Sequence, residues 1–133
     1  MSRDVFNSLQ SKGGGKGQKV KDLLDQWNVV HDEKVSFAKY NPQKYYWMEP
    51  NEMVLKGDWT PVLFNMDTMI MTVFRVPKDS FFVGEGGLQK KRKDPKKQNS
   101  LSLKFREESF TEICSKMEFG GFVSSIIKVS LID

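Results

Sequence analysis

Hydrophobic residues recur along the first part of the chain with the period of an α-helix. In the segment 19–30 they lie three or four positions apart: Val20, Leu23, Leu24 and Trp27. This spacing places all four on one helical face, while lysine, aspartate and glutamine occupy the other. The segment therefore predicts an amphipathic helix whose apolar face packs against another element, most simply a sheet.

Further along, apolar and polar positions alternate, which is the period of a β-strand. The pattern occurs in the segments 34–40, 44–55, 61–76, 80–83, 100–106 and 122–132. A turn at 49–52 divides the second of these into two short runs, so six or seven strands are predicted. The segment 61–76 has one nearly continuous apolar face and a second that is half apolar, which predicts a long, central, bent strand.

A second helical pattern occurs late, in the segment 107–119. Its apolar residues Phe110, Ile113, Cys114 and Met117 share one helical face. A Ser-x-x-Glu capping box accompanies them, and a Gly-Gly pair follows. The pattern predicts one short helix with Cys114 on its apolar side.

The order of these segments predicts an α+β fold, with an antiparallel, curved sheet, an N-terminal helix and one short late helix. A small, partly open barrel of the oligonucleotide-binding type and a helix-backed sheet are the alternatives for the sheet. The chain has 133 residues, enough for one core, and we expect a single globular domain at 19–133. The basic, glycine-rich segment 1–18 is predicted to be a flexible leader with a short anchored piece at Val5, Phe6 and Leu9.

Positive charge is concentrated in one short stretch. The net charge is +4, and six of the eight residues at 90–97 are lysine or arginine. Unpaired lysine and arginine are rarely buried, and Pro95 cannot donate to a strand ladder, so we expect an exposed basic loop at 89–99 between two strands. Three interpretations of this loop stay open: an arm that contacts phosphates, a nuclear localisation signal, and a solvated loop without a partner.

Aromatic and basic residues are interleaved between Lys39 and Trp47. Aromatic rings stack on the bases of single-stranded nucleic acid while cations follow the phosphates, although such rings also commonly fill a core. On a strand, Tyr45 and Trp47 would share one face and Tyr46 would take the other. The candidate nucleic-acid-binding residues are Lys39, Lys44, Tyr45, Tyr46, Trp47, Trp59, Lys90, Lys91, Arg92, Lys93, Lys96 and Lys97, and Lys12, Lys16 and Lys19 could add phosphate contacts.

The chain carries few residues suited to catalysis or metal binding. Its one histidine, His31, and one cysteine, Cys114, are too few for the common structural zinc sites, and the glycine-rich stretch lacks the GxxxxGK[ST] pattern of a phosphate loop. We therefore expect no enzymatic activity and no cofactor. A single cysteine excludes an internal disulfide and suits a reducing compartment. No segment approaches the roughly 20 apolar residues of a membrane span, and the first residues lack the apolar region of a secretory signal.

These observations favour a non-enzymatic nucleic-acid-binding protein that prefers single-stranded DNA or RNA. The alternative is a protein-interaction or assembly module, such as a viral or regulatory structural subunit. In that case the basic loop would be a docking arm or a nuclear localisation signal read by an import receptor. The expected setting is intracellular, with the nucleus as a destination if the loop is such a signal. A homo-oligomer is compatible with both hypotheses, and a membrane partner is not expected.

Overall fold

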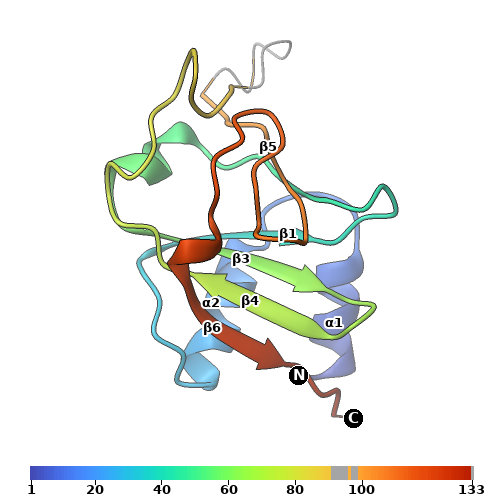
Figure 1. Ribbon diagram of the computed structural model, residues 1–133. Helices are drawn as coiled ribbons and strands as arrows, with labels where there is room; N and C mark the ends of the chain where they lie inside the picture. Colours follow the sequence, from blue (N-terminus) through green and yellow to red (C-terminus); the bar gives the residue numbers. More distant parts are fainter. Residues whose placement is uncertain (91–95, 97–98, 133) are drawn as a thin grey trace.

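The computed structural model describes residues 1–90, 96 and 99–132, and it confirms the predicted α+β class (Figure 1). The helices are α1 (Arg3–Gln10) and α2 (Gly17–Gln26), with 3-10 helices η1 (Glu52–Lys56) and η3 (Gly120–Phe122). The strands are β1 (Lys34–Lys39), β2 (Tyr46–Met48), β3 (Trp59–Asn65), β4 (Ile70–Phe74), β5 (Leu103–Phe105) and β6 (Val123–Lys128). Neither α-helix of the described chain has the length and apolar character that crossing a membrane requires.

Four strands form the main sheet in the order β1-β3-β4-β6, and β2 pairs with β5 in a separate two-stranded ribbon. β1 runs parallel to β3, whereas β3–β4 and β4–β6 are antiparallel. The sheet is therefore mixed rather than purely antiparallel, because the chain leaves it after β1 to form β2 and η1 before it returns in β3. β1 and β6 lie at opposite ends of the strand order, so the described strands form an open sheet rather than a barrel.

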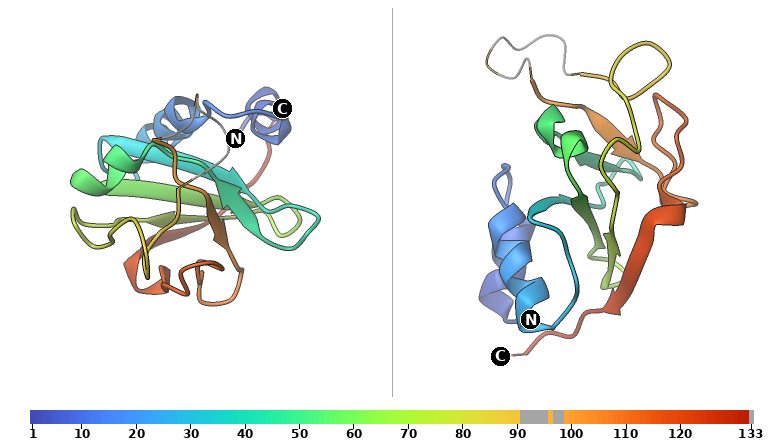
Figure 2. Two further views of the ribbon diagram at one scale, coloured as in Figure 1. Left: turned by 90° about the horizontal axis from the view of Figure 1, so that it is seen from above. Right: turned by 90° about the vertical axis from the view of Figure 1, so that its left-hand side faces the viewer.

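The main sheet separates two hydrophobic cores, and β3 is buried at all seven of its positions. Val62 and Phe64 face the helices and pack in one core with Leu24. Leu63 faces the opposite way, into a core that it shares with Phe105 of the ribbon. The right-hand view of Figure 2 shows this layering, with α1 and α2 on one side of the sheet and the ribbon with its loops on the other.

The single long strand predicted at 61–76 is instead the hairpin of β3 and β4. The reversal follows from Asn65, whose side-chain oxygen accepts hydrogen bonds from the backbone N–H groups of Asp67 (2.9 Å) and Thr68 (3.2 Å). Met69 then adopts a positive φ of 60° and closes the turn. An asparagine that binds the backbone two and three residues ahead favours a turn over a continuous strand.

The late helix predicted at 107–119 is absent from the described chain, and this segment consists of turns and isolated bridges. Ser109, Phe110 and Lys116 have positive φ angles, which a right-handed helix excludes. Glu112 does not cap a helix. Its buried carboxylate accepts hydrogen bonds from the backbone N–H groups of Lys104 (2.9 Å) and Ser115. Cys114 is exposed rather than on an apolar helical face.

Two of the shorter predicted strands also differ from the structure. The second half of the segment 44–55 forms η1, because the side chain of Asn51 accepts a hydrogen bond from the N–H of Met53 and starts a helical turn. The segment 80–83 makes only an isolated bridge, between Val83 and Leu88. Between the first two strands the chain turns at 41–44, where the side chain of Asn41 accepts the backbone N–H of Tyr45.

The first ten residues are more ordered than the flexible leader predicted for 1–18. The side chain of Ser2 caps α1 by accepting the backbone N–H of Val5, and Leu9 is fully buried in the core under the helices. The amino group of Met1 also donates to the carbonyl of Ser130, 3.0 Å away. The anchored piece expected around Val5 and Leu9 is thus a complete short helix.

Candidate nucleic-acid interface

Two of the four aromatic candidates belong to the core. Trp59 is 0% exposed, and its indole N–H donates to the hydroxyl of Ser36 at 3.0 Å. Tyr46 is also buried, and its hydroxyl donates to Glu107 at 2.7 Å. Burial, together with the Glu107 carboxylate, raises the pKa of Tyr46. Neither ring can stack on a base, so both leave the candidate set.

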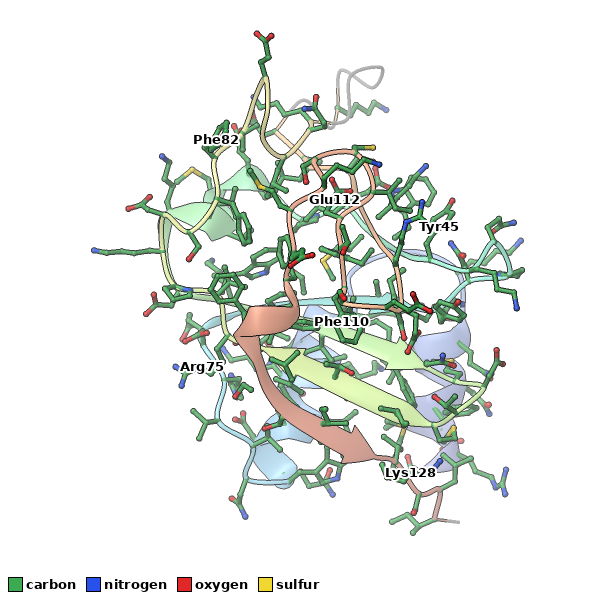
Figure 3. The ribbon with its side chains drawn as sticks, in the orientation of Figure 1. Tyr45, Arg75, Phe82, Phe110, Glu112 and Lys128 are labelled. Atoms are coloured by element: carbon green, nitrogen blue, oxygen red, sulfur yellow. The ribbon has the colours of Figure 1, made fainter. Side chains whose placement is uncertain are left out.

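Tyr45 and Trp47 remain accessible, and they lie on the outer face of the ribbon. β2 and β5 pair antiparallel with Trp47 opposite Lys104, so the three side chains share one face by alternation. The ammonium of Lys104 lies 5.2 Å from the centroid of the Tyr45 ring and 5.5 Å from that of Trp47. Trp47 is 45% exposed, and Tyr45 is half-buried. We call Tyr45, Trp47 and Lys104 the ring face. Figure 3 shows Tyr45 at the outer margin of the molecule, whereas Phe110 lies beside the central strands.

Hydrogen bonds fix the ring face from both strands. The indole N–H of Trp47 donates to the hydroxyl of Ser102 at 3.3 Å. Lys104 is held through its backbone, because its N–H donates to the buried Glu112 carboxylate and its carbonyl accepts the N–H of Ile113 at 2.8 Å. β5 therefore has a hydrogen-bonding partner on each side, and the Lys104 side chain projects from an anchored strand.

Sequence reasoning missed Lys104, although a signal was present. The alternation in the segment 100–106 places Leu103 and Phe105 on one face and Ser102 and Lys104 on the other. Arg106 is the next residue of the same parity, and it is exposed. What the sequence lacked was the pairing of β5 with β2, which brings this polar face beside Tyr45 and Trp47.

The basic loop begins and ends close to the ring face. Lys90 forms a bridge with Leu101, and its ammonium lies 3.3 Å from the Glu52 carboxylate. The carbonyl of Asn99 accepts the backbone N–H of Glu52 at 2.8 Å. Asn99 is three residues from Ser102, a span of about 10 Å in an extended chain. The candidates Lys91, Arg92, Lys93 and Lys97 lie outside the described residues, and Lys96 lies within them.

The other two lysine candidates differ in their surroundings. Lys39 ends β1, and its ammonium donates to the carbonyl of Gln10, so it ties the sheet to the end of α1. Lys44 is exposed in the turn that leads into β2, with a positive φ of 71°. Lys44 is next to Tyr45 in the chain and stays in the candidate set, whereas Lys39 acts in a structural contact.

His31 makes contacts that do not involve Cys114. Its Nδ1 lies 2.7 Å from the Asp32 carbonyl and its Nε2 lies 2.5 Å from the Asp25 carboxylate. Both neighbours are acceptors, so both ring nitrogens must carry protons when both bonds form. The bond to the Asp32 carbonyl, and then the Asp25 carboxylate, raise the pKa of His31 against the opposing effect of burial. Within residues 1–90, 96 and 99–132, no three histidine, cysteine or acidic side chains gather as a metal site would require.

Comparison with known proteins gives no relative: no protein-family model matches the chain, and no curated protein or solved structure is significantly similar to it.

Proposed function

We propose that this chain is a non-enzymatic nucleic-acid-binding protein that prefers single strands and binds them on the ring face and the adjoining basic loop. The observation that carries the proposal is the ring face itself, where two accessible aromatic rings flank an ammonium group at 5.2 and 5.5 Å. Every base has a π-face that can stack on such a ring, and the neighbouring cation can contact the phosphate between stacked bases.

The preference for single strands follows from access. In a duplex the base faces are stacked on one another, so an aromatic side chain on an outer ribbon face reaches a base only when the strand is open. The ring face offers few polar groups that could read base edges, because the indole N–H of Trp47 is already bonded to Ser102. Binding should therefore depend weakly on sequence.

The basic loop supplies the second part of the proposal. Its described ends, Lys90 and Asn99, are held at η1 and just before β5. Lysine and arginine that contact phosphates release counterions, which makes affinity fall as salt rises. We expect the ring face to determine the preference for unpaired bases and the loop to determine the salt dependence.

Fluorescence separates the contribution of the ring face from the rest of the protein. The chain has three tryptophans: Trp59 is buried, Trp27 packs against the core under the helices, and only Trp47 lies on the ring face. Titration with oligo(dT) and oligo(U) should quench the emission in the wild type and in Trp27→Phe, but not in Trp47→Phe. Trp47→Ala should weaken anisotropy-measured binding by about 5- to 150-fold, the equivalent of one lost stacking contact.

A charge-matched pair of variants tests the loop. Replacing Lys91, Arg92 and Lys93 by glutamine should reduce affinity for all sequences alike and flatten the dependence of log K on log salt by about 2 to 3. The matched control replaces Lys34, Lys56 and Lys78, three exposed lysines outside the ribbon and the basic loop, and should leave the slope nearly unchanged. If the two triple variants lower the affinity and the salt slope equally, the binding is nonspecific charge attraction to which the loop makes no special contribution. No binding by the wild type at low salt would refute the proposal.

The alternative function is a protein-interaction or assembly module. The observation that favours it is a groove of about 460 Å³ lined by Leu55, Val83 and the exposed Met53 and Phe82, which borders Glu52 at the base of the basic loop. Under this alternative the chain works inside the cell, and the basic loop is a docking arm or an import signal for the nucleus. The loop variant would then lose nuclear accumulation or partner binding, while nucleic-acid affinity stays negligible in every variant.

A further inference from the structure

β6 forms one border of the main sheet, and no strand of the described chain pairs with its outer edge. Val129, the residue after β6, shows which backbone groups face β4. Its N–H donates to the carbonyl of Met69, the residue before β4, at 2.8 Å. Backbone groups alternate in direction along an antiparallel strand, and Ile127 pairs with Met71 in the same register. Ile126 and Lys128 therefore direct their N–H and C=O groups away from β4, towards solvent.

This edge is protected only at its two ends, by a register irregularity at the start of β6 and by Met1, which binds the backbone of Ser130 and Ile132 just beyond Lys128. Edge strands are commonly guarded by charged side chains, proline or a bulge. The sequence of β6, VSSIIK, contains no proline and one charged residue, Lys128. The ammonium of Lys128 donates to the Thr68 carbonyl, so it is drawn back over the β3–β4 turn. The register irregularity lies opposite Val73 and Phe74, at the start of the strand, and leaves Ile126 in regular pairing geometry.

Ile126 is the most exposed large hydrophobic side chain in the described part of the structure, at 69%. It points to the face of the sheet opposite the helices, because its neighbour Ile127 packs into the core under them. An exposed isoleucine in the middle of an open edge combines unpaired backbone groups with apolar surface. Both features favour pairing with a further strand.

We propose that the further strand is β6 of a second copy of this chain, paired antiparallel with Ile126 opposite Ile126. Only residues whose backbone groups point outward can pair directly, so the alternative registers differ by steps of two residues. With Ile126 on the two-fold axis, Lys128 lies across from the irregular start of the partner's strand, near Ser124, and the two lysines avoid each other. A register with Lys128 opposite Lys128 would place like charges face to face, which destabilises a cross-strand pair. The edge is thus complementary to itself in the register that covers the exposed isoleucine.

Two antiparallel strands in one sheet are related by an axis perpendicular to the sheet, so the dimer would form a continuous sheet with equivalent faces on the same side. The helices of both copies would cover one side, and both ring faces would lie on the other. The pairing does not depend on the proposed nucleic-acid function, but it would present two copies of that site to one strand.

The expected association is weak. Stable protein–protein interfaces bury about 1,200 to 2,000 Å² in total, and pairing along one short strand falls below that range. Sedimentation equilibrium of the full chain, from micromolar to submillimolar concentration, should show a reversible monomer–dimer equilibrium and no larger species.

Charge-swapped variants test the register. Ile126→Lys and Ile126→Glu should each be monomeric, with dimerisation weakened more than tenfold by opposed like charges. An equimolar mixture of the two should recover the dimer, because only a register with residue 126 opposite residue 126 pairs the two charges. Val30→Lys changes a side chain of similar exposure (64%) between α2 and β1 and should dimerise as the wild type does.

Three results would overturn the proposal: a wild type that is monomeric at every concentration, a dimer that survives in Ile126→Lys, or a mixture of the charge variants that stays monomeric. Circular dichroism of each variant verifies the fold. Because residue 126 is exposed, the substitutions are expected to leave thermal stability nearly unchanged.

Discussion

The buried carboxylate of Glu112 should be one of the most sensitive positions in the ribbon layer. Glu112 is 0% exposed, and its two oxygens accept separate backbone N–H groups, from Lys104 at 2.9 Å and Ser115 at 2.8 Å. A buried donor that loses its acceptor costs about 1–3 kcal/mol. Glu112→Ala leaves both donors without their acceptor and should lower the free energy of unfolding by about 2–6 kcal/mol.

Glu112→Gln is the sharper variant because it keeps the shape. One of the two oxygens becomes an NH₂ group, which then faces a backbone N–H, so one of the two hydrogen bonds is lost. The expected loss is about 1–3 kcal/mol, intermediate between the wild type and Glu112→Ala. Urea denaturation followed by far-UV circular dichroism measures all three proteins under one condition.

The matched control is Glu108→Gln, which removes the same charge from an exposed position of the same segment. It should change the free energy of unfolding by less than about 0.5 kcal/mol. If Glu112→Gln behaves like this control, the carboxylate does not hold the two backbone groups as the structure indicates, and the account of how Lys104 is anchored fails.

Two further predictions concern the helix layer. The raised pKa of His31 means that its bonds to Asp25 and the Asp32 carbonyl stabilise the fold fully below about pH 6.5, the unfolded value, and lose this contribution as pH rises through the folded pKa. The stability difference between wild type and His31→Gln, measured in urea at several pH values, should therefore shrink from about pH 6.5 upward. A constant difference would contradict a charged imidazole. At Gly17, an added Cβ would lie 2.4 Å from the carbonyl oxygen of Val35, so Gly17→Ala should cost about 1–3 kcal/mol, while the same change at the open position Gly14 should cost little.

Periodicity predicted the elements whose burial is simple. The apolar face of the segment 19–30 became the buried face of α2, with Val20, Leu23 and Leu24 in the core. The strict alternation at 34–40 became β1. In both cases one repeating pattern determined one element, and no distant residue was needed to interpret it.

The two largest failures, at 61–76 and 107–119, have a different cause, because both segments contain a side chain that binds the backbone. Asn65 turns the chain between β3 and β4, where hydropathy alone showed one continuous strand. Glu112 binds the N–H of a residue eight positions earlier, so its capping pattern was real in sequence but was satisfied by tertiary contacts. The donors of Asn65 are local, so its turn was hidden by the stronger hydropathy pattern, whereas no local pattern reveals the more distant donor of Glu112.

The candidate site also contains residues that the local pattern assigned correctly and residues that it could not assign. Alternation separated Tyr45 and Trp47 from Tyr46, and the structure agrees. Nothing in the local pattern distinguished Trp59, which is buried because β3 is covered on both faces. Lys104 could be assigned to the polar face of its strand, but its position between two rings required the β2–β5 register.

β3 lies between the two cores and contributes side chains to both. The helix layer and the ribbon layer can therefore separate from the sheet independently of each other. Amide exchange in β3 requires separation from helices and ribbon alike, so its amides should exchange with deuterium most slowly. The ribbon layer touches the sheet from one side only. Its transient detachment would expose the core that Leu63 shares with Phe105, while the helix-backed sheet stays folded. Such a partial opening would change the position of the ring face without a global loss of structure.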